Sequence, residues 1–419
     1  MGPLTDLPVS EDPADPVDPV VAPLSLFGLE FSLDTASLDA LEAVTRSVTK
    51  AQVRSWFCRR AGTEEVALLS TCHRVELVVL ARSRGELHRW RRALPGRRDS
   101  WNVREGREVV HHLFRVAVGR ESLAVGESEV RYQVRDAGRS IESRHPRPVL
   151  RELFRGAAEA AEVARPSVPP SCSIASIAAQ RLLDLLGRPL PRVLVVGSGT
   201  VGLRVAESLA PFAIVTVAFH ERAPDAAFLR VTGARAVPLE QLAEAIAATD
   251  AVITAAKFGN RGLLASDLPR DRPLVLVDLG VPRNIDPAVR ELPNARLVDL
   301  EELHGLARSA PLADDLDARV ELLADQLSDH LDRLLLEPWV DAVRRAAEEA
   351  RRSELAHARS FLGPLDPAQE AAIDRLTRRL VARLLLSPTE RIRSLSPGPD
   401  GDRLRRFALD LLSPAPPDP

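Results

Sequence analysis

The chain has 419 residues, is 45% hydrophobic and 27% charged, and carries a formal net charge of −3. This length suits two or three globular domains, and the small net charge excludes nucleic-acid binding driven by overall charge. Three cysteines exclude a disulfide framework, and no metal-ligand spacing joins them to histidines, so no metal site is expected. Neither a secretory leader nor a membrane-length apolar run occurs, which predicts a cytoplasmic protein without membrane contact.

The first part of the chain predicts a small α+β domain. Residues 1–22 are rich in proline and aspartate and lack a hydrophobic period, so a disordered tail is expected there. Strand-like and helical stretches then alternate up to residue 170, which is typical of the split β-α-β type. Strands are expected at Leu24–Phe31, Val66–Leu69 and Val75–Ala81, and helices at Leu38–Val53, Ser83–Leu94, Glu108–Val118 and Leu150–Ala164.

A cysteine occupies the short link between the second and third of these strands. Cys72 is flanked by the hydroxyl of Thr71, the imidazole of His73 and the guanidinium of Arg74. A cation beside a thiol favours the thiolate, which is the nucleophilic form. Cys72 is therefore either a catalytic nucleophile or an inert half-buried cysteine, and the link by itself does not decide between the two.

Arginines are concentrated after this link. Nine occur between Arg82 and Arg107, against Glu86, Asp99 and Glu105. This pattern fits the solvated face of an arginine-rich protein or a patch that binds RNA.

A polar loop follows, bracketed by Gly119 and Gly126, and a predicted helix after it carries Gln133. Glycine at such positions allows the backbone to pass close to a ligand, although most loops of this kind are simple turns.

A glycine-rich turn opens the second domain. The apolar run Val193–Val196 is a buried strand of the parallel type, and the helix expected at Leu203–Leu209 follows Gly197-Ser198-Gly199-Thr200-Val201-Gly202. This is G-x-G-x-x-G in the strand–turn–helix context that it requires. Backbone N–H groups at the helix start bind pyrophosphate, and further strand-like runs indicate a Rossmann-type fold. Those runs are Ile214–Phe219, Ala251–Ala255 and Leu274–Asp278.

Two features near the strand ends bear on the ligand. Glu221 and Arg222 follow the second Rossmann strand. An acid there suits the ribose hydroxyl of NAD and an arginine suits the 2′-phosphate of NADP, so the choice stays open. The segment Asp278–Asp286 follows another strand, where an open α/β sheet binds ligands; a proline-shaped loop fits equally well.

The last part of the chain is helical. Apolar residues from Leu312 to Leu334 alternate at spacings of four and three, which is the pattern of a coiled-coil seam. Such a seam would pack against a second copy of the chain or within the same chain. Pro338 is expected to kink or end this helix. Further helices are expected at Pro367–Leu386 and Arg403–Leu412.

Five segments, in chain order, resemble motifs of the glutamyl-tRNA reductase family, which carries out the first step of the five-carbon route to tetrapyrroles. Five matches in order are far more specific than any one of them, and they cover residues from roughly Leu24 to Arg393. They are Thr71–Glu76 (T-C-N-R-x-E in the family), His112–Ala117 (H-L-F-R-V-A), Glu121–Gln133 (D-S-x-x-x-G-E-P-Q-x-x-x-Q), Asp278–Pro287 (D-x-x-V-P-R-D-I-D-P) and Leu385–Thr389 (L-x-x-P-T).

The resemblance implies an α/β multidomain fold and a reaction. An α+β catalytic domain (residues 23–170), a Rossmann-type NADP-binding domain (171–305), and a long spinal helix with an all-α dimerisation domain (306–419) are expected. Cys72 would attack the ester of glutamyl-tRNA(Glu) to form a thioester, which NADPH would reduce to glutamate-1-semialdehyde. The implied partners are a second copy of the chain, held through the C-terminal helices, and glutamate-1-semialdehyde aminomutase.

The resemblance also implies roles for single residues. Cys72 matches the nucleophile, and His112 matches a nearby histidine that would transfer a proton or position groups. Without the family, His112 is equally well explained as a core histidine. The cofactor residues are Gly197, Ser198, Gly199, Thr200, Val201 and Gly202. The substrate-binding positions are Thr71, His73, Arg74, Ser122, Glu127, Ser128, Glu129 and Gln133.

The chain departs from the family pattern around the substrate. His73 stands where asparagine is usual, and Arg120 and Glu121 replace leucine and aspartate. Ser128 and Glu129 replace proline and glutamine.

Two other functions fit the same residues. One is a non-catalytic regulator that binds glutamyl-tRNA or a pathway partner, which would need no reactive thiolate. The other is an NAD(P)-dependent reductase of a small acyl substrate, which would not depend on charged tRNA.

Overall fold

The computed structural model describes residues 24–122, 128–144, 148–164, 173–256, 262–307, 314–363 and 365–394. The tail expected at 1–22, Glu127 and the helix expected at Arg403–Leu412 lie outside these ranges. The chain forms two compact units, one of Leu26–Leu80 with Gly85–Ser328 and another that contains Asp329–Pro419. Across the described ranges, no helix has the length and apolar character needed to cross a membrane.

The first sheet confirms the split β-α-β prediction. Its strand order is β4-β1-β3-β2-β5, and β1 is antiparallel to β4, with Phe27 opposite Glu105. The three predicted strands are present, and two short ones that the pattern did not predict complete the sheet. The bounds are β1 Ser25–Ser32, β2 Thr63–Ser70, β3 Arg74–Ala81, β4 Asn102–Glu105 and β5 Glu142–Ser143.

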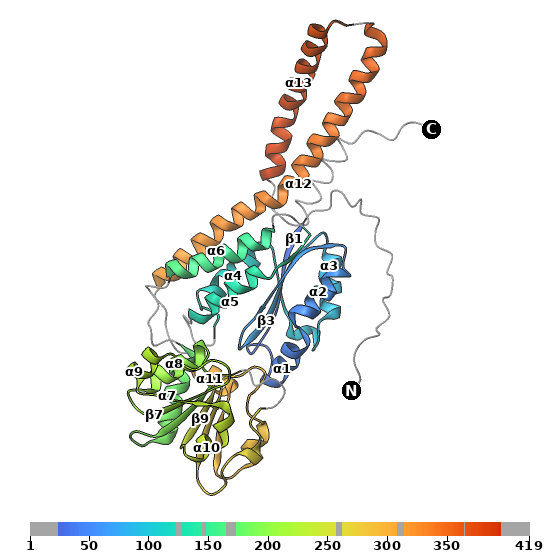
Figure 1. The fold of residues 1–419 in the computed structure, drawn as a ribbon. Helices are drawn as coiled ribbons and strands as arrows, with labels where there is room; N and C mark the ends of the chain where they lie inside the picture. The colour runs from blue at the N-terminus through green and yellow to red at the C-terminus, as the bar shows by residue number, and fades with distance from the viewer. Residues whose placement is uncertain are drawn as a thin grey trace. The chain divides into compact units, whose positions relative to one another are not determined.

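Helices cover this sheet on both sides, with α4, α5 and α6 on one and α2 and α3 on the other (Figure 1). The single helix expected at Leu38–Val53 is wrong. Two helices form, because the Thr49 side chain accepts a hydrogen bond from the backbone N–H of Gln52 and caps a new helix start. The bounds are α1 Leu38–Ser47, α2 Lys50–Cys58, α3 Arg84–Ala93, α4 Arg107–Ala117, α5 Ser128–Arg139 and α6 Val149–Ala164, with the 3₁₀ helix η1 at Arg98–Ser100.

The second sheet is a parallel Rossmann-type sheet. Its order is β11-β10-β9-β6-β7-β8, and every neighbouring pair is parallel. The pattern missed β8 and β11, which have four residues each, too few to show a period. The bounds are β6 Arg192–Val196, β7 Ile214–Phe219, β8 Arg235–Pro238, β9 Ala251–Thr254, β10 Leu274–Asp278 and β11 Ala295–Val298.

Alternation along β6 divides the core of this domain into two layers. Val193 and Val195 pack with α7, α8 and α11, whereas Leu194 and Val196 pack with α10 on the opposite face. Both faces are covered, which is why the strand is continuously apolar. The helix bounds are α7 Ile174–Leu186, α8 Thr200–Leu209, α9 Ala226–Thr232, α10 Leu242–Ala247 and α11 Leu300–Ala307, with 3₁₀ helices η3 Leu239–Gln241, η4 Ala265–Asp267 and η5 Pro287–Glu291.

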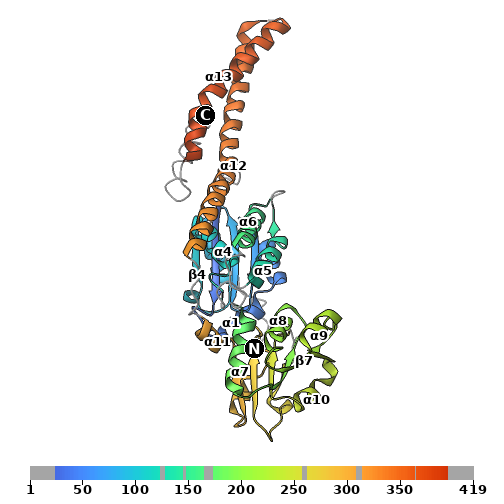
Figure 2. The same ribbon diagram turned by 90° about the vertical axis from the view of Figure 1, so that its left-hand side faces the viewer.

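Two long helices end the described chain, α12 (Asp314–Leu362) and α13 (Pro367–Ser394). Of the two outcomes expected at Pro338, a kink or an end, the end does not occur, since α12 continues through it; α13 likewise contains Pro388. Figure 2 shows α13 running back beside the end of α12. Arg351 Nη1 on α12 donates to Asp374 Oδ1 on α13 at 2.8 Å and so fixes this hairpin.

The start of α12 explains part of the predicted seam. Val320 and Ala324 are buried within the first unit. Leu327 contacts α6 so closely that a Cβ on Gly156 would lie 2.7 Å from its Cδ2 atom. Packing within one chain therefore accounts for Val320 and Leu327 of the predicted seam.

A buried carboxylate shapes the loop after β10. Asp278 accepts backbone hydrogen bonds from Gly280 at 2.9 Å, Asn284 at 2.7 Å and Ile285 at 2.9 Å, and a fourth from Thr254 Oγ1 at 2.8 Å. Burial raises the pKa of this carboxyl, and the hydrogen bonds oppose that rise. Asp278 thus folds the loop back on the sheet edge.

We expect Asp278→Asn to lower the free energy of unfolding by about 2–4 kcal/mol. The side-chain amide would place its NH₂ group where one carboxylate oxygen now accepts hydrogen bonds from two backbone N–H groups. Those two N–H groups would lose their acceptor, and each unsatisfied buried donor costs roughly 1–3 kcal/mol. Urea unfolding with an unchanged slope measures this loss. Asp271→Asn, at an exposed loop position, is the control and should leave the midpoint in place. A wild-type midpoint for Asp278→Asn would contradict the expectation.

Candidate active site

Backbone hydrogen bonds fix the link between β2 and β3. The N–H of Thr71 donates to the carbonyl of Arg74 at 2.9 Å, and the N–H of Leu33 donates to the carbonyl of His73 at 3.0 Å. The Thr71 hydroxyl accepts from the N–H of His73 at 3.4 Å. Cys72, which is partly exposed, is therefore held at the tip of a rigid turn.

The Cys72 side chain lines a pocket between the α+β and Rossmann domains. Helix α5 contributes Glu129, Val130 and Gln133. The Rossmann domain contributes Val201 from the first turn of α8 and Leu279 from the loop after β10; Ile174 and Leu300 complete the lining. The thiol thus shares one pocket with the start of the glycine-loop helix.

Three side-chain oxygen atoms of the predicted substrate residues have no hydrogen-bond partner in the part of the chain that the structure describes. They are Glu129 Oε2, Gln133 Oε1 and Ser122 Oγ, and all three are shielded from solvent. Two belong to the lining of the Cys72 pocket. A buried oxygen without a donor costs free energy, so such atoms favour a ligand that supplies N–H or O–H groups.

His73 is buried beside the cysteine. Its Nδ1 atom lies 4.0 Å from Cys72 Sγ, and its Nε2 atom lies 3.0 Å from Arg74 Nη2 and 2.9 Å from the carbonyl oxygen of Glu121. Burial, together with the positive charge of Arg74, lowers the pKa of His73 to about 3. The ring is therefore neutral at physiological pH.

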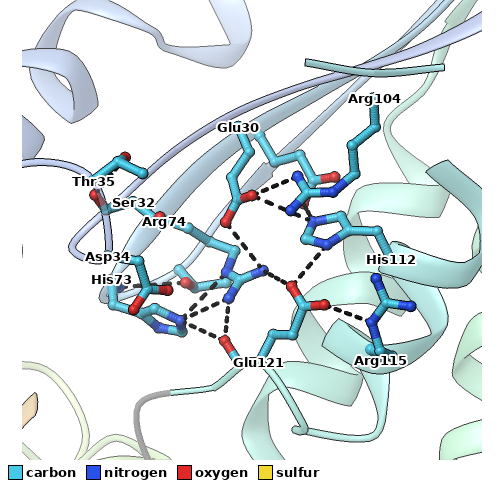
Figure 3. Close-up of polar contacts among 12 residues, drawn as sticks. Glu30, Ser32, Asp34, Thr35, His73, Arg74, Arg104, His112, Arg115 and Glu121 are labelled. Atoms are coloured by element: carbon cyan, nitrogen blue, oxygen red, sulfur yellow. Dashed lines mark hydrogen bonds and ion pairs between the residues drawn. The ribbon is translucent and has the colours of Figure 1, made fainter. Parts of the chain in front are cut away.

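A cluster of charges lies behind His73 and centres on Arg74, whose side chain is 1% exposed (Figure 3). Arg74 Nη1 lies 3.5 Å from Glu30 Oε1 and 3.7 Å from Glu121 Oε2. Arg74 also donates to the backbone carbonyl of Glu121. Glu30 pairs in addition with Arg104 at 2.6 Å. A buried guanidinium needs such partners, because an unpaired buried charge costs several kcal/mol.

His112 completes this charge cluster. Its Nε2 atom lies 3.2 Å from Glu76 Oε2, and its Nδ1 atom lies 2.7 Å from Glu121 Oε2. Burial by itself lowers the pKa of His112, but the two carboxylates outweigh that effect and raise it to about 9. Burial likewise raises the pKa of Glu121, but His112 and Arg115 reverse this and hold it well below its usual range. His112 is thus an imidazolium at neutral pH and is no proton acceptor there.

The charge cluster extends to the start of α12 within the same unit. Arg115 Nε donates to Glu121 Oε1 at 2.7 Å, and its Nη1 donates to Glu321 Oε1 at 3.3 Å. Glu321 also pairs with His111, whose other nitrogen lies 3.2 Å from Asp325 Oδ1. One arginine therefore joins the carboxylate beside Arg74 to the long helix.

The glycine loop has the geometry that a bound pyrophosphate needs. Gly197 has φ +119°, and a Cβ on Gly202 would lie 2.0 Å from the Gly197 carbonyl oxygen, so both positions require glycine. At Gly199, by contrast, a Cβ would meet nothing within 4 Å. Helix α8 begins at Thr200 rather than at Leu203 as expected, and no side chain caps its start. The first N–H groups are thus available to an anion.

The structure brings the predicted residues together in two groups. Cys72, Glu129, Gln133 and Val201 share the pocket, whereas His73, Arg74 and His112 belong to the charge cluster behind it. Glu127 lies outside the described residues, as does the side chain of Ser128. Sequence reasoning missed Glu30, Arg104 and Glu321; the signal available for Glu30 was a charged residue within an apolar strand run.

Three family models match the chain. Residues 29–168 match the N-terminal domain of glutamyl-tRNA(Glu) reductase, residues 178–306 match shikimate/quinate 5-dehydrogenase, and residues 316–413 match the dimerisation domain of glutamyl-tRNA(Glu) reductase. The glutamyl-tRNA reductase of Kineococcus radiotolerans is 32% identical over 405 residues, covering 90% of this chain and 91% of that protein. The chain belongs to the glutamyl-tRNA reductase family.

Two further glutamyl-tRNA reductases resemble the chain over most of its length. The Rubrobacter xylanophilus glutamyl-tRNA reductase is 30% identical over 383 residues, which is 84% of this chain and 89% of that protein. The solved glutamyl-tRNA reductase of Methanopyrus kandleri aligns with a TM-score of 0.51 and 26% identity over 92% of this chain and 97% of that one. The chain is therefore an oxidoreductase of the first step of tetrapyrrole biosynthesis, and its dehydrogenase-type Rossmann domain is a nicotinamide-cofactor domain.

We expect the stability of the protein to fall as pH rises from about 6.5 to 9. The folded-state pKa of His112 lies above its unfolded value, so its contribution is complete below pH 6.5 and is lost as pH passes 9. A shift of this size corresponds to about 3 kcal/mol. His112→Gln should flatten this slope in urea unfolding series at pH 6, 7.5 and 9.

The matched control is His88→Gln, on the exposed face of α3, which should keep the wild-type slope. Equal slopes in wild type and His112→Gln would show that His112 titrates at its ordinary pKa.

Proposed function

We propose that the protein reduces glutamyl-tRNA(Glu) to glutamate-1-semialdehyde with NADPH, and that Cys72 carries the glutamyl group as a thioester. The observation that carries this proposal is the shared pocket of Cys72 and Val201, because Val201 belongs to the glycine loop. A thioester formed on Cys72 would stand beside the nucleotide-binding edge of the parallel sheet, where such folds hold their cofactors.

The chemistry balances with groups that the proposal names. The Cys72 thiolate attacks the ester carbonyl carbon, a C–S bond forms, and the C–O bond to the tRNA ribose breaks. The ribose oxygen leaves with the bonding pair and takes a proton from water. When bound at the glycine loop, NADPH would be the source of the hydride that reduces the thioester to the aldehyde. The C–S bond then breaks, and the thiolate is regenerated.

The glutamyl group would be held by the atoms that lack partners. Its α-ammonium group has three N–H donors and one positive charge, which suit the Glu129 carboxylate and the Gln133 amide oxygen. The charge on Glu129, where the family usually has glutamine, would strengthen this contact. The remaining proposed substrate-binding residues are Thr71, Ser122, Glu127 and Ser128, whereas His73 and Arg74 are buried in the charge cluster behind the pocket.

His112 takes a positioning role in this proposal. Both ring nitrogens already face carboxylates, and the charged ring holds Glu121 against Arg74 and Arg115. This arrangement keeps the guanidinium in place behind the cysteine.

NADPH is the proposed form of the nicotinamide cofactor. Ser198 Oγ of the glycine loop donates to the backbone carbonyl of Arg222 at 2.6 Å, which places Arg222 beside the loop. Its side chain is exposed and has the positive charge that a 2′-phosphate needs. Gly197, Ser198, Gly199, Thr200, Val201 and Gly202 would hold the pyrophosphate.

The partners follow from the family and the C-terminal helices. The match to a dimerisation domain supports a homodimer. Three leucines four residues apart on α13 fit this assembly, because Leu376, Leu380 and Leu384 are more than half exposed and a second copy would cover them. We further propose a cytoplasmic location and transfer of the aldehyde to glutamate-1-semialdehyde aminomutase.

We expect Cys72→Ser to abolish single-turnover reduction of glutamyl-tRNA, with a loss of at least about 1000-fold, because a serine hydroxyl is not ionised at neutral pH. Aldehyde formation and the covalent glutamyl adduct are both measured, by trapping and by mass spectrometry. Cys58→Ser, at an exposed position on α2, should keep wild-type turnover. If the wild-type protein binds charged tRNA but forms neither adduct nor aldehyde, that result would contradict the proposal and favour a non-catalytic regulator.

We expect Arg222→Ala to raise the KM for NADPH about tenfold or more while leaving the KM for NADH nearly unchanged. The variant removes a cation that would contact only the 2′-phosphate. Steady-state kinetics with each cofactor on the same preparation make NADH the internal control. Equal changes for both cofactors would show that Arg222 does not discriminate between them.

A further inference from the structure

We propose that His73 is a positioning residue that donates its Nδ1–H to the Cys72 thiolate, which stabilises the thiolate and fixes the direction of Sγ. The family usually has asparagine at this position, so the inference concerns a feature of this chain. It deepens the proposed function, because Cys72 is the nucleophile there. The contact itself exists without tRNA or nucleotide and can be measured without either.

The distance and burial support a hydrogen bond to sulfur. Nδ1 of His73 lies 4.0 Å from Cys72 Sγ, and His73 is 1% exposed. Sulfur is a large and weak acceptor as a thiol, but a thiolate carries a full charge and accepts more strongly. Because the imidazole is buried, water does not compete for Nδ1.

The neighbours of His73 decide which nitrogen carries the proton. Arg74 Nε lies 3.3 Å and Arg74 Nη2 lies 3.0 Å from His73 Nε2, and a guanidinium has donors only. Two donors facing one nitrogen favour a lone pair on Nε2, which places the proton of the neutral ring on Nδ1, whereas the Glu121 carbonyl favours the opposite tautomer. The Glu121 carbonyl, 2.9 Å from Nε2, already accepts a hydrogen bond from Arg74.

The charges around His73 keep the ring in this neutral form. Arg74 faces it from β3 and Glu121 from the loop after α4; Asp34 from the turn after β1 and His304 from α11 complete its charged surroundings. Burial and the Arg74 charge outweigh the acid and lower the pKa of His73 to about 3. A neutral donor therefore faces the sulfur throughout the pH range in which a thiol ionises. The negative charge of Glu129, across the pocket, disfavours the Cys72 thiolate. The Nδ1–H donor of His73 offsets this unfavourable effect.

The proposal separates His73 from a histidine that acts as a base. A base would need its unprotonated nitrogen toward the thiol, whereas here the guanidinium occupies that nitrogen. Asparagine can replace the donor, because its side-chain nitrogen is as many bonds from Cα as Nδ1 of histidine. Leucine has similar bulk and no donor.

The test is the ionisation of Cys72, followed by the rate of alkylation with iodoacetamide between pH 5 and 10. The full chain is used with Cys58→Ser and Cys172→Ser, so that Cys72 is the single thiol. We expect the wild-type thiol pKa to lie below the ordinary value of about 8.5. His73→Leu should raise it by about one unit, which slows alkylation about tenfold at pH 7. His73→Asn should retain most of the wild-type behaviour.

Two outcomes would overturn the proposal. One is an unchanged thiol pKa in His73→Leu, and the other is an equal rise in His73→Leu and His73→Asn. Urea midpoints show whether each variant is folded. If the leucine variant does not fold, His73→Gln replaces it, since its donor lies one bond too far from Cα and the same rise is expected. No tRNA or nucleotide is present, so a failed reductase assay and a failed His73 assay are separate results.

Discussion

The architecture of the site depends on one buried cation. The Arg74 guanidinium, shielded almost entirely from solvent, lies within 3.7 Å of carboxylate oxygens from Glu30 and Glu121 and also faces His73. Removing one partner from such a cluster leaves an uncompensated buried charge, which costs about 3–5 kcal/mol. The positions of β1, β3 and the loop after α4 are therefore tied together by charge balance as well as by apolar packing.

This charge balance links the cysteine turn to the long helix. Glu121 pairs with Arg115, and Arg115 also contacts Glu321 on α12. The contacts thus run from the turn that carries Cys72 to the first turns of α12, which lie within the match to a dimerisation domain. If Glu121 paired only with His112, the start of α12 would lose this connection to the turn that carries Cys72.

The Rossmann domain contributes a second, independent constraint. Gly202 cannot carry a Cβ because the Gly197 carbonyl is too close, so the loop and α8 pack without side chains between them. Asp278 folds the next loop back with three backbone hydrogen bonds. The two loops bring Val201 and Leu279 to the pocket of Cys72, and the Cys72 thiol and the glycine loop therefore meet across two domains.

The sequence alone determined the parts whose signal is local: strands and helices with a clear period, the glycine loop, and the motif that contains Cys72. It also placed His73, Glu129 and His112 near the site through family resemblance. Only the tertiary structure decided how these residues are used. Three of these features depend on contacts between residues far apart in the chain. They are the carboxylates around His112, the nitrogen of His73 that faces sulfur, and the packing of α12 on α6. Burial and charge pairing set these properties, and neither is a function of spacing along one segment.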